Sequence, residues 1–213
     1  MKIIFCLPGN KFSGDFMLNF ISLLKFVESK GIKCQVSQQY SSMVNFARCK
    51  CAGANVKRGK KQKPFNGLPY DYMMWVDSDI IFNNESFEKL ISLDKHIASG
   101  WYSQPGGTSP VVEKMNNDFF QKHGSYEFLT IEDMSEKQKP FLADYIGFGW
   151  VLIKTGVFES MEYPWFAPKI MSLGENQDVC SEDVSWCHDA KEVGHEIWVD
   201  PSCRVGHEKT IVI

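Results

Sequence analysis

The sequence has no apolar run near the roughly 20 residues that a membrane-spanning helix needs. It also has no excess of basic residues: 23 Lys and Arg stand against 26 Asp and Glu, for a formal net charge of -3. This balance does not point to nucleic acid or to an anionic membrane as a partner. The apolar start, residues 1–9, is too short for a signal peptide and lacks a small-residue cleavage site, so we expect a buried first strand there.

Regular cysteine spacing and complete phosphate-binding loops are missing as well. The seven cysteines form no CxxC pair, so we expect reduced thiols in a cytoplasmic protein and no zinc site. The stretch Gly53–Gly59 has one residue too many between its glycines for a P-loop, and 147–149 lacks the third glycine of a dinucleotide fingerprint. The basic run 57–63 is expected to be a solvated loop, with a flap over a diphosphate as the alternative.

Strand-like and helix-like apolar patterns alternate along the chain, which favours one α/β layered domain. The expected strands are 2–7, 32–37, 71–76, 97–102, 196–199 and 204–206, with strand-like periodicity over 141–153. The expected helices are the segment between Ser13 and Gly31, then 41–54, 84–93, 155–161 and 181–193. In the first helix, the apolar residues at helical spacing are Met17, Phe20, Ile21, Leu24 and Val27. The pattern weakens between 103 and 139.

Two carboxylates follow the apolar strand 72–76. Asp77 and Asp79, separated by Ser78, come directly after its last residue, at the strand end where an open α/β sheet has its ligand crevice. Carboxylates in such a place are costly unless a cation is near, and a hard divalent ion with oxygen ligands is the natural partner. The alternative is an acidic turn that caps the next element.

A DxD segment after a buried strand resembles the metal-binding motif of GT-A glycosyltransferases. Four further segments resemble that family and follow its order: Leu7-Pro8-Gly9 at the first strand end, Ser42 to Arg48 ending in Ala-Arg, Asp144 to Ile153 with its two glycines, and Glu182-Asp183. His207 after a glycine completes the order. The resemblance implies a GT-A-like, Rossmann-like mixed central sheet flanked by helices, in a single domain spanning 1–213. About 1–100 would bind the nucleotide and about 101–213 the acceptor.

The resemblance also implies roles for individual residues. It places the nucleotide sugar on Leu7, Pro8, Gly9, Ser42, Asn45, Arg48, Asp77, Ser78, Gly147, Gly149 and Trp150. It gives Asp77, Asp79 and His207 to the metal, with Asp77 acting directly or through the ribose or a water, and Glu182 and Asp183 to the acceptor hydroxyl. Trp150 and Trp186 would offer faces to a sugar ring. The local alternatives are a Pro-Gly turn, a surface arginine, a strand bulge, a helix cap and core aromatic residues.

The activity implied is transfer of a hexosyl or deoxyhexosyl group from a UDP-sugar to a carbohydrate hydroxyl, with Mn2+ or Mg2+. Within the family the chain is similar to a chlorella-virus glycosyltransferase domain. That likeness slightly favours retention of configuration, a host-cytoplasmic location and a place as one module of a longer polypeptide.

Three other functions compete with this one. A phosphatase of the haloacid dehalogenase type also has DxD after an apolar strand, but normally the first strand, with the first Asp as nucleophile. A sugar nucleotidyltransferase would need a glycine-rich basic loop after strand one, and residues 8–11 are a poor version of it. A non-catalytic carbohydrate-binding domain would need aromatic residues and no metal-diphosphate site.

Overall fold

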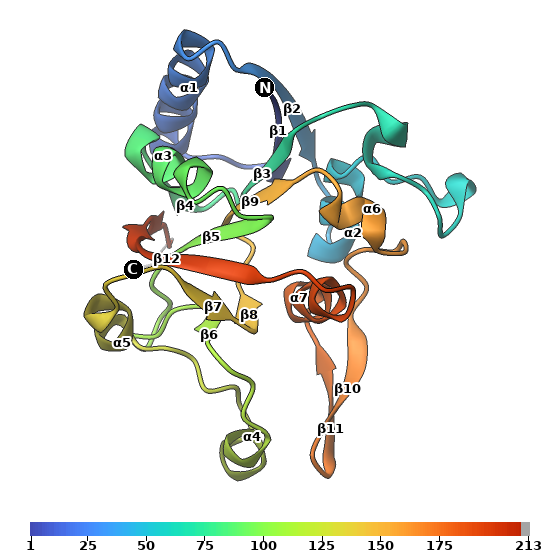
Figure 1. Cartoon of the computed structure of the whole chain (residues 1–213), viewed down its shortest axis with the longest axis vertical. Coiled ribbons are helices and arrows are strands. Elements are labelled where there is room, and N and C mark those ends of the chain that lie inside the picture. The colour runs from blue at the N-terminus through green and yellow to red at the C-terminus, as the bar shows by residue number, and fades with distance from the viewer. Residues whose placement is uncertain (210–213) are drawn as a thin grey trace.

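A seven-stranded mixed sheet forms the centre of the computed structural model (Figure 1), with the strand order β2-β1-β3-β9-β5-β12-β7. The structure describes residues 1–209, and the side chains of residues 173 and 176 lie outside this description. The sheet strands are β1 (Lys2–Pro8), β2 (Lys33–Gln39), β3 (Tyr72–Val76), β5 (Ile97–Trp101), β7 (Phe141–Ala143), β9 (Trp150–Lys154) and β12 (Ile197–Arg204). The short strands are β4 (Ile80–Ile81), β6 (Val111–Val112), β8 (Tyr145–Ile146), β10 (Lys169–Leu173), β11 (Asn176–Cys180) and β13 (Gly206–His207).

Helices cover both faces of this sheet. They are α1 (Gly14–Ser29), α2 (Val44–Cys51), α3 (Asn84–Ser92), α4 (Asn117–His123), α5 (Ile131–Glu136), α6 (Val157–Ser160) and α7 (Glu182–Glu192). One face packs against α1 and α3, and the other against α2, α6 and α7. The expected single α/β domain with a mixed sheet is therefore confirmed.

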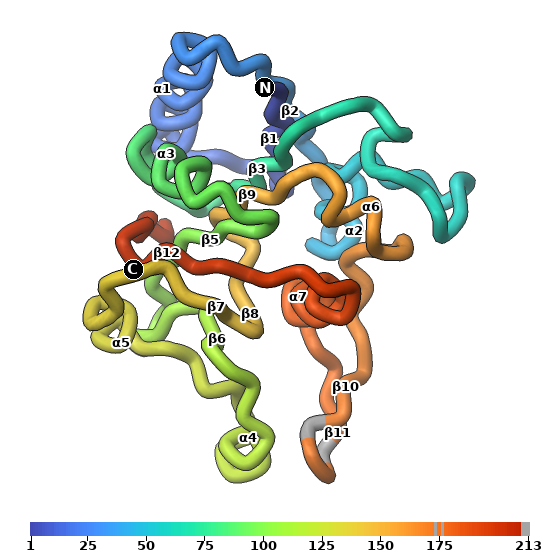
Figure 2. Tube along the Cα trace, viewed as in Figure 1, coloured from blue at the N-terminus to red at the C-terminus, as the bar shows by residue number. Residues whose placement is uncertain are grey.

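The order of the strands mixes the two halves of the chain. Strand β9, from the second half, lies antiparallel between β3 and β5 of the first half. Figure 2 shows this late segment running back among the early strands. The predicted nucleotide-binding and acceptor-binding parts therefore share one sheet, and groups at its edge can come from either half.

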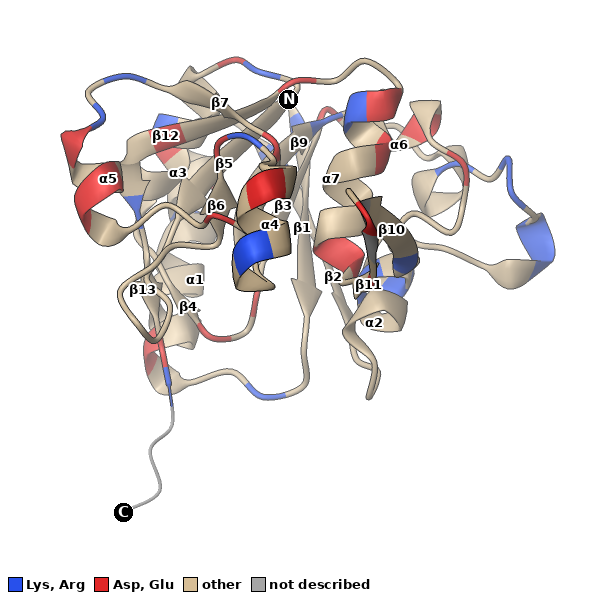
Figure 3. Cartoon of the chain, turned by 90° about the horizontal axis from the view of Figure 1, so that it is seen from below, with Lys and Arg blue, Asp and Glu red and all other residues tan. Residues whose placement is uncertain are grey.

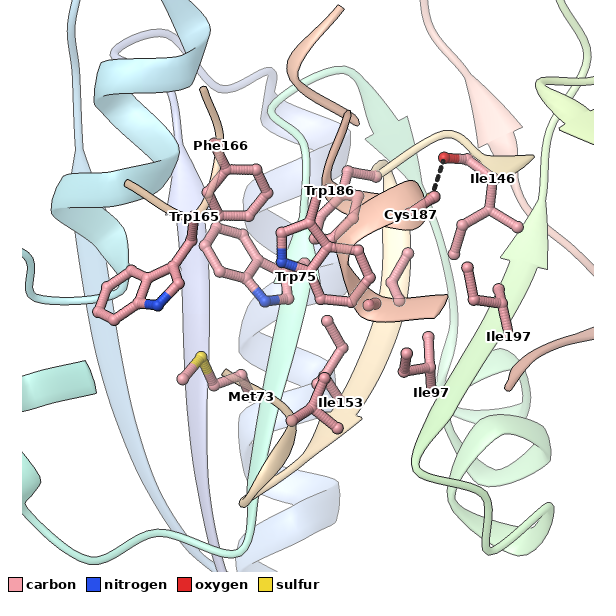
Figure 4. Packing of buried hydrophobic residues seen from close by; sticks show 14 of the residues in the cluster. Met73, Trp75, Ile97, Ile146, Ile153, Trp165, Phe166, Trp186, Cys187 and Ile197 are labelled. Carbon is pink, nitrogen blue, oxygen red and sulfur yellow. Dashed lines mark hydrogen bonds between the residues drawn. The ribbon is translucent and has the colours of Figure 1, made fainter. Parts of the chain in front are cut away.

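The core alternates across the sheet as strand geometry requires. Along β1, Ile3 and Phe5 belong to the apolar cluster under α1 and α3, and Ile4 and Cys6 to the cluster under α2 and α7. The second cluster is rich in aromatic rings (Figure 4), where Trp75 lies 5.3 Å from Phe166 and 5.9 Å from Phe158, between ring centroids. This packing fixes the end of β3, where the two carboxylates follow.

Helix α1 begins and ends as the sequence predicts, but its buried residues differ from the set of apolar residues at helical spacing. Ser13 caps it by accepting a hydrogen bond from the backbone N–H of Phe16. Its buried residues are Phe16, Phe20, Leu23 and Val27, whereas Met17 and Ile21 are exposed. Two of the five apolar residues at helical spacing therefore lie outside the buried face. Apolar residues occur on nearly all sides of this helix, so periodicity alone could not choose the face that meets the sheet.

Several short elements in the second half were missed. Helix α4 is capped by Asn116 and ends at Gly124 in the left-handed region, and α5 starts with a capping box between Thr130 and Asp133. The hairpin of β10 and β11 was also missed, and Ile170 in it is largely exposed. Short exposed elements bury little apolar surface, so the hydrophobic pattern carries little trace of them. No helix of residues 1–209 is both long and apolar enough to cross a membrane.

Candidate active site

Asp77 and Asp79 lie in a tight turn between β3 and β4, at the carboxyl end of β3. The backbone N–H of Ile80 donates to the carbonyl of Asp77 at 3.1 Å, which closes the turn. The N–H of Asp77 donates to the carbonyl of Gly149 at 3.0 Å, and the N–H of Glu208 donates to that of Asp79 at 2.7 Å. The turn is thus held by β9 on one side and by the chain after β13 on the other.

His207 lies beside Asp79 because β13 pairs with β4. In that antiparallel pair His207 is opposite Ile80, so its side chain reaches the carboxylate next in sequence. Its Nε2 atom is 3.1 Å from Oδ2 of Asp79, and Nζ of Lys209 is 2.9 Å from the same oxygen. The structure brings together Asp79 and His207, two of the three residues expected at a metal.

The hydrogen bond at Nδ1 of His207 determines which atoms can lie between the other ring nitrogen, Nε2, and the Asp79 carboxylate. Its Nδ1 is 3.0 Å from the backbone carbonyl of Ser103, and a carbonyl can only accept, so Nδ1 carries a proton. In a neutral ring Nε2 then has a lone pair facing the Asp79 carboxylate, which is also an acceptor. The two atoms are compatible when they share a cation, either a proton or a metal ion. A carbonyl that orients a histidine in this way is the usual support of a metal ligand.

The charge around the turn also suits a divalent cation. Four carboxylates (Asp77, Asp79, Glu182 and Asp183) face the cationic side chains Arg48 and Lys209 in this network of ion pairs, which leaves an excess of two negative charges. Oxygen ligands with one imidazole suit Mn2+, and the carboxylates alone suit Mg2+. The residues present therefore fit the expected ion.

Asp77 is placed differently from Asp79. Both of its carboxylate oxygens accept hydrogen bonds from Arg48, from Nη1 and Nη2, each at 2.9 Å. The Nε of the same guanidinium donates to Oε1 of Glu182 at 3.1 Å. The side chain of Arg48 is only 4% exposed, and it connects α2, the end of β3 and the start of α7. Figure 3 shows α2 and α7 side by side at this place.

The pKa values in this cluster reflect burial and mutual charge. Burial acts to lower the pKa of Arg48, but the charges and hydrogen bonds of Asp77 and then the charge of Glu182 outweigh it, so the pKa is raised and the side chain stays charged. Burial raises the pKa of Asp77, and Arg48 opposes that rise. Burial and then the charge of Asp183 raise the pKa of Glu182, again against the effect of Arg48.

Asp183 is held at the beginning of α7 by two hydroxyl groups. The hydroxyl of Tyr145 donates to its Oδ2 at 2.9 Å, and the hydroxyl of Ser181 donates to its Oδ1. Burial and then the charge of Asp183 raise the pKa of Tyr145 well above its usual value, so this donor keeps its proton. Ser181 precedes the helix as predicted, but its side chain orients Asp183 and caps no backbone N–H.

The glycines of the site are explained by close contacts within the protein. A Cβ on Gly149 would lie 2.6 Å from Cε1 of Tyr102, and one on Gly147 would lie 2.5 Å from the hydroxyl oxygen of the same ring. Gly9 has a φ of +150°, and a Cβ there would lie 2.8 Å from Cβ of Ser78. The predicted nucleoside-binding strand end therefore touches the DxD turn. Tyr102 in turn packs on His207, with ring centroids 4.7 Å apart.

The remaining predicted residues differ in how accessible they are. Leu7 and Pro8 are buried at the end of β1, whereas Ser42 is exposed and Asn45 half-buried at the start of α2. Trp150 and Trp186 are fully buried, the first stacked on Phe82 and the second packed on Phe148. Neither ring presents a face to a sugar here, because both complete the apolar core, and the expectation of stacking at these two positions is corrected.

Sequence reasoning missed the residues that support the site. They are Tyr102, Ser103, Tyr145 and Lys209, and each acts through a contact with a residue far away in the sequence. Nothing in their local sequence distinguishes them. The basic run 57–63, predicted as a solvated loop with a flap as the alternative, forms a short 3-10 helix and a turn, and the N–H of Tyr163 donates to the carbonyl of Lys60. None of its side chains forms an ion pair with any of the described residues.

One other group of possible metal ligands occurs in the described part of the chain. The ligand atoms of His188, Asp189 and Glu192 lie within 4.8 Å of one another near the end of α7. Asp189 is already paired with Lys169. Exposed acidic groups of this kind are common without an ion, and this one is not connected to the DxD turn.

Comparison with solved structures shows that the whole chain has a known fold. No protein-family model and no curated protein sequence matches the chain. Solved structures do match. GalNAc-T7, crystallised with UDP, GalNAc and Mn2+, aligns over 99% of this chain and 43% of its own, with a TM-score of 0.58 and 10% identity. The chain has a GT-A-like fold.

Two further structures support that assignment of the fold. TarS of S. aureus (residues 1–349) aligns over 97% of this chain and 60% of its own, with a TM-score of 0.52 and 11% identity. A197 from STIV aligns over 100% of this chain and 97% of its own, with a TM-score of 0.53 and 14% identity. The chain thus spans less than two thirds of the GalNAc-T7 and TarS chains, but nearly all of the A197 chain.

Proposed function

We propose that this protein is a metal-dependent glycosyltransferase that moves a hexosyl or deoxyhexosyl group from a UDP-sugar to a carbohydrate hydroxyl. The observation that carries the proposal is the Asp79–His207 pair at the carboxyl end of β3, whose facing acceptor atoms are placed to share a divalent cation. The GT-A-like fold adds support, and the GalNAc-T7 structure holds UDP and Mn2+. Retention of configuration, a cytoplasmic location and a viral source remain expectations from the sequence, and the free cysteines agree with the second.

Asp79 and His207 would hold the ion, with the Ser103 carbonyl fixing the tautomer of the imidazole. A bound Mn2+ or Mg2+ neutralises the charge that builds on the departing diphosphate. Asp77 would act through the ribose or a water rather than as a direct ligand, because each of its oxygens already accepts one hydrogen bond from Arg48 and has one lone pair left. Asp77 is half-buried and adjoins Ser78, which Gly9 at the end of β1 approaches closely, so it lies on the side where the ribose would bind.

The nucleotide would lie across the strand ends between α2 and the DxD turn. Leu7, Pro8 and Gly9 would face the base and ribose largely through backbone groups, since the first two side chains are buried. Ser42 and Asn45 at the start of α2 would contribute polar groups from the other side. Gly147 lies against Tyr102 on the side from which the sugar would enter.

The acceptor would approach the start of α7. Asp183 keeps its carboxylate fixed between Tyr145 and Ser181, so it can accept a hydrogen bond from an acceptor hydroxyl and orient it for attack on the anomeric carbon. Glu182 lies beside it, turned toward Arg48. No general base is required if configuration is retained, and Asp183 then acts by positioning.

The phosphatase alternative is disfavoured by the state of Asp77. A bidentate ion pair with a buried guanidinium stabilises the negative charge of Asp77 and so makes its oxygens poorer nucleophiles. A carbohydrate-binding domain would have no use for a buried cluster of one arginine and two carboxylates. A nucleotidyltransferase shares the metal chemistry and is separated from the proposal by its substrates.

The test is to incubate the protein with Mn2+ and a panel of UDP-sugars and to follow slow release of UDP. We expect release from one or a few donors, its loss with excess EDTA, and at least a 100-fold decrease in Asp79→Asn, about 2.7 kcal/mol of lost transition-state stabilisation. Circular dichroism would check that the variant is folded. Full activity of Asp79→Asn, or in EDTA, would exclude the metal role; phosphate release from phosphomonoesters or synthesis of a UDP-sugar from UTP would replace the proposal.

A further inference from the structure

Arg48 is the only buried Lys or Arg among the residues that the structure describes. It extends from α2 and contacts Asp77, 29 positions away in sequence, and Glu182, 134 positions away. One guanidinium therefore joins the carboxylate beside the proposed donor to the carboxylate beside the proposed acceptor. Each contact is a charge-assisted hydrogen bond in a place with little water, where such bonds are strong.

The geometry of this side chain leaves it little freedom. A guanidinium is planar, and its two Nη atoms match the two oxygens of one carboxylate as a fork. The plane also lies near the ring of Phe148, with 5.2 Å from Cζ to the ring centroid. Phe148 packs on Trp186, which is fully buried. The aromatic core thus fixes the orientation of the Arg48 guanidinium, and the guanidinium in turn fixes the orientation of the Asp77 and Glu182 carboxylates.

We propose that Arg48 is a positioning residue that keeps Asp77 and Glu182 in register across the two sides of the reaction centre. This inference rests on the proposed function, since it assigns roles to carboxylates of that site. It differs from the role that the family resemblance suggests, a direct contact with the diphosphate. The Nε and both Nη atoms of Arg48 already donate to protein carboxylates, and its side chain is almost wholly covered.

A consequence of this arrangement is that charge alone cannot replace Arg48. A lysine at this position keeps a positive charge but has no fork, so it can hold one carboxylate oxygen and not three at fixed angles. A misplacement of about 1 Å in a reacting group costs about 100-fold in rate. We therefore expect Arg48→Lys to remain folded and to lose turnover mainly through the misaligned Glu182.

The experiment measures kcat and KM for UDP release from the best donor, in the wild-type background and in a Glu182→Gln background. Arg48→Lys is expected to lower kcat about 100-fold in the first background and to change it within about 2-fold in the second. Glu182→Gln removes the negative charge that Arg48 is proposed to position beside the acceptor, so it should itself lower kcat and leave little further loss for Arg48→Lys to cause. The control is Lys154→Arg, an exchange between the same two residue types at a lysine that pairs with Asp94, at the end of β9 far from the site.

Each outcome decides between distinct explanations. A loss of similar size in both backgrounds shows that Arg48 does not act through Glu182, and it overturns the inference that Arg48 keeps the two carboxylates in register. A lowered melting temperature with unchanged kcat and KM shows a structural role only, and also overturns it. A large rise in KM with unchanged kcat, independent of Glu182, indicates the direct phosphate contact instead. If the wild-type protein releases no UDP from any donor, the proposed function fails, whereas the results above refute the positioning role alone.

Discussion

Replacing Gly149 by alanine tests whether the glycines of the site exist to make room for Tyr102. Gly149 lies just before β9, and its φ is not positive, so an alanine can adopt its backbone conformation. The obstacle is space: the new Cβ would lie 2.6 Å from Cε1 of Tyr102 and 3.0 Å from Cδ1 of Ile80. Ordinary carbon contacts are about 3.5–4.0 Å, so the tyrosine ring would have to move by about 1 Å.

The size of the effect follows from what surrounds that ring. Tyr102 is buried, and overpacking of a buried site costs about 1–3 kcal/mol. In a chain of this length that corresponds to a melting temperature lower by about 2–12 °C. Because Tyr102 packs on His207, a displaced ring also moves a proposed metal ligand. We therefore expect Mn2+ affinity to fall about 10- to 100-fold, as for other groups that support a metal ligand.

The assay is thermal unfolding of the apo-protein together with a titration of Mn2+ followed by electron paramagnetic resonance. Gly14→Ala is the matched control, since a Cβ there meets nothing within 4 Å at the first position of α1. In a Tyr102→Leu background, Gly149→Ala should cost less than about 1 kcal/mol, because the obstructing ring is gone. An equal cost in both backgrounds, or a destabilised protein with unchanged Mn2+ affinity, would refute the reasoning.

Two further predictions concern the acceptor side and the pH dependence of stability. Asp183→Asn should lower transfer to the acceptor about 100-fold while Mn2+-dependent UDP binding, measured by calorimetry, stays as in the wild type; a matching loss of UDP affinity would show that Asp183 serves the donor instead. Burial and then the charge of His96 lower the pKa of His195, so the unfolded chain binds the proton more readily and stability falls as the pH drops below about 6.5. His195→Gln should flatten this slope between about pH 7 and pH 5 in denaturant titrations, and an unchanged slope would contradict the assignment.

Local sequence was sufficient for the elements that bury a strong apolar pattern. β1, β3 and α1 have such patterns, and the cap at Ser13 is read from residues a few positions apart. Local sequence was also sufficient to locate the DxD turn, because two acids directly after a buried apolar strand lie at the carboxyl end of that strand, where the sheet has its ligand crevice. The periodicity could not choose which face of α1 packs on the sheet, since that depends on the neighbours that it meets.

Tertiary structure decided which residue of the site contacts which partner. The sequence by itself determined a metal-compatible strand end and an ordered set of candidate partners, including His207. Only the pairing of β13 with β4 brings that histidine to Asp79. Only the packing of α2 places Arg48 within hydrogen-bond distance of Asp77. Such contacts join residues more than 100 positions apart in several cases, and a local pattern cannot encode a partner's distance or direction. For the same reason Trp150 was predicted at a sugar and lies in the core, where a ring of its size completes the packing.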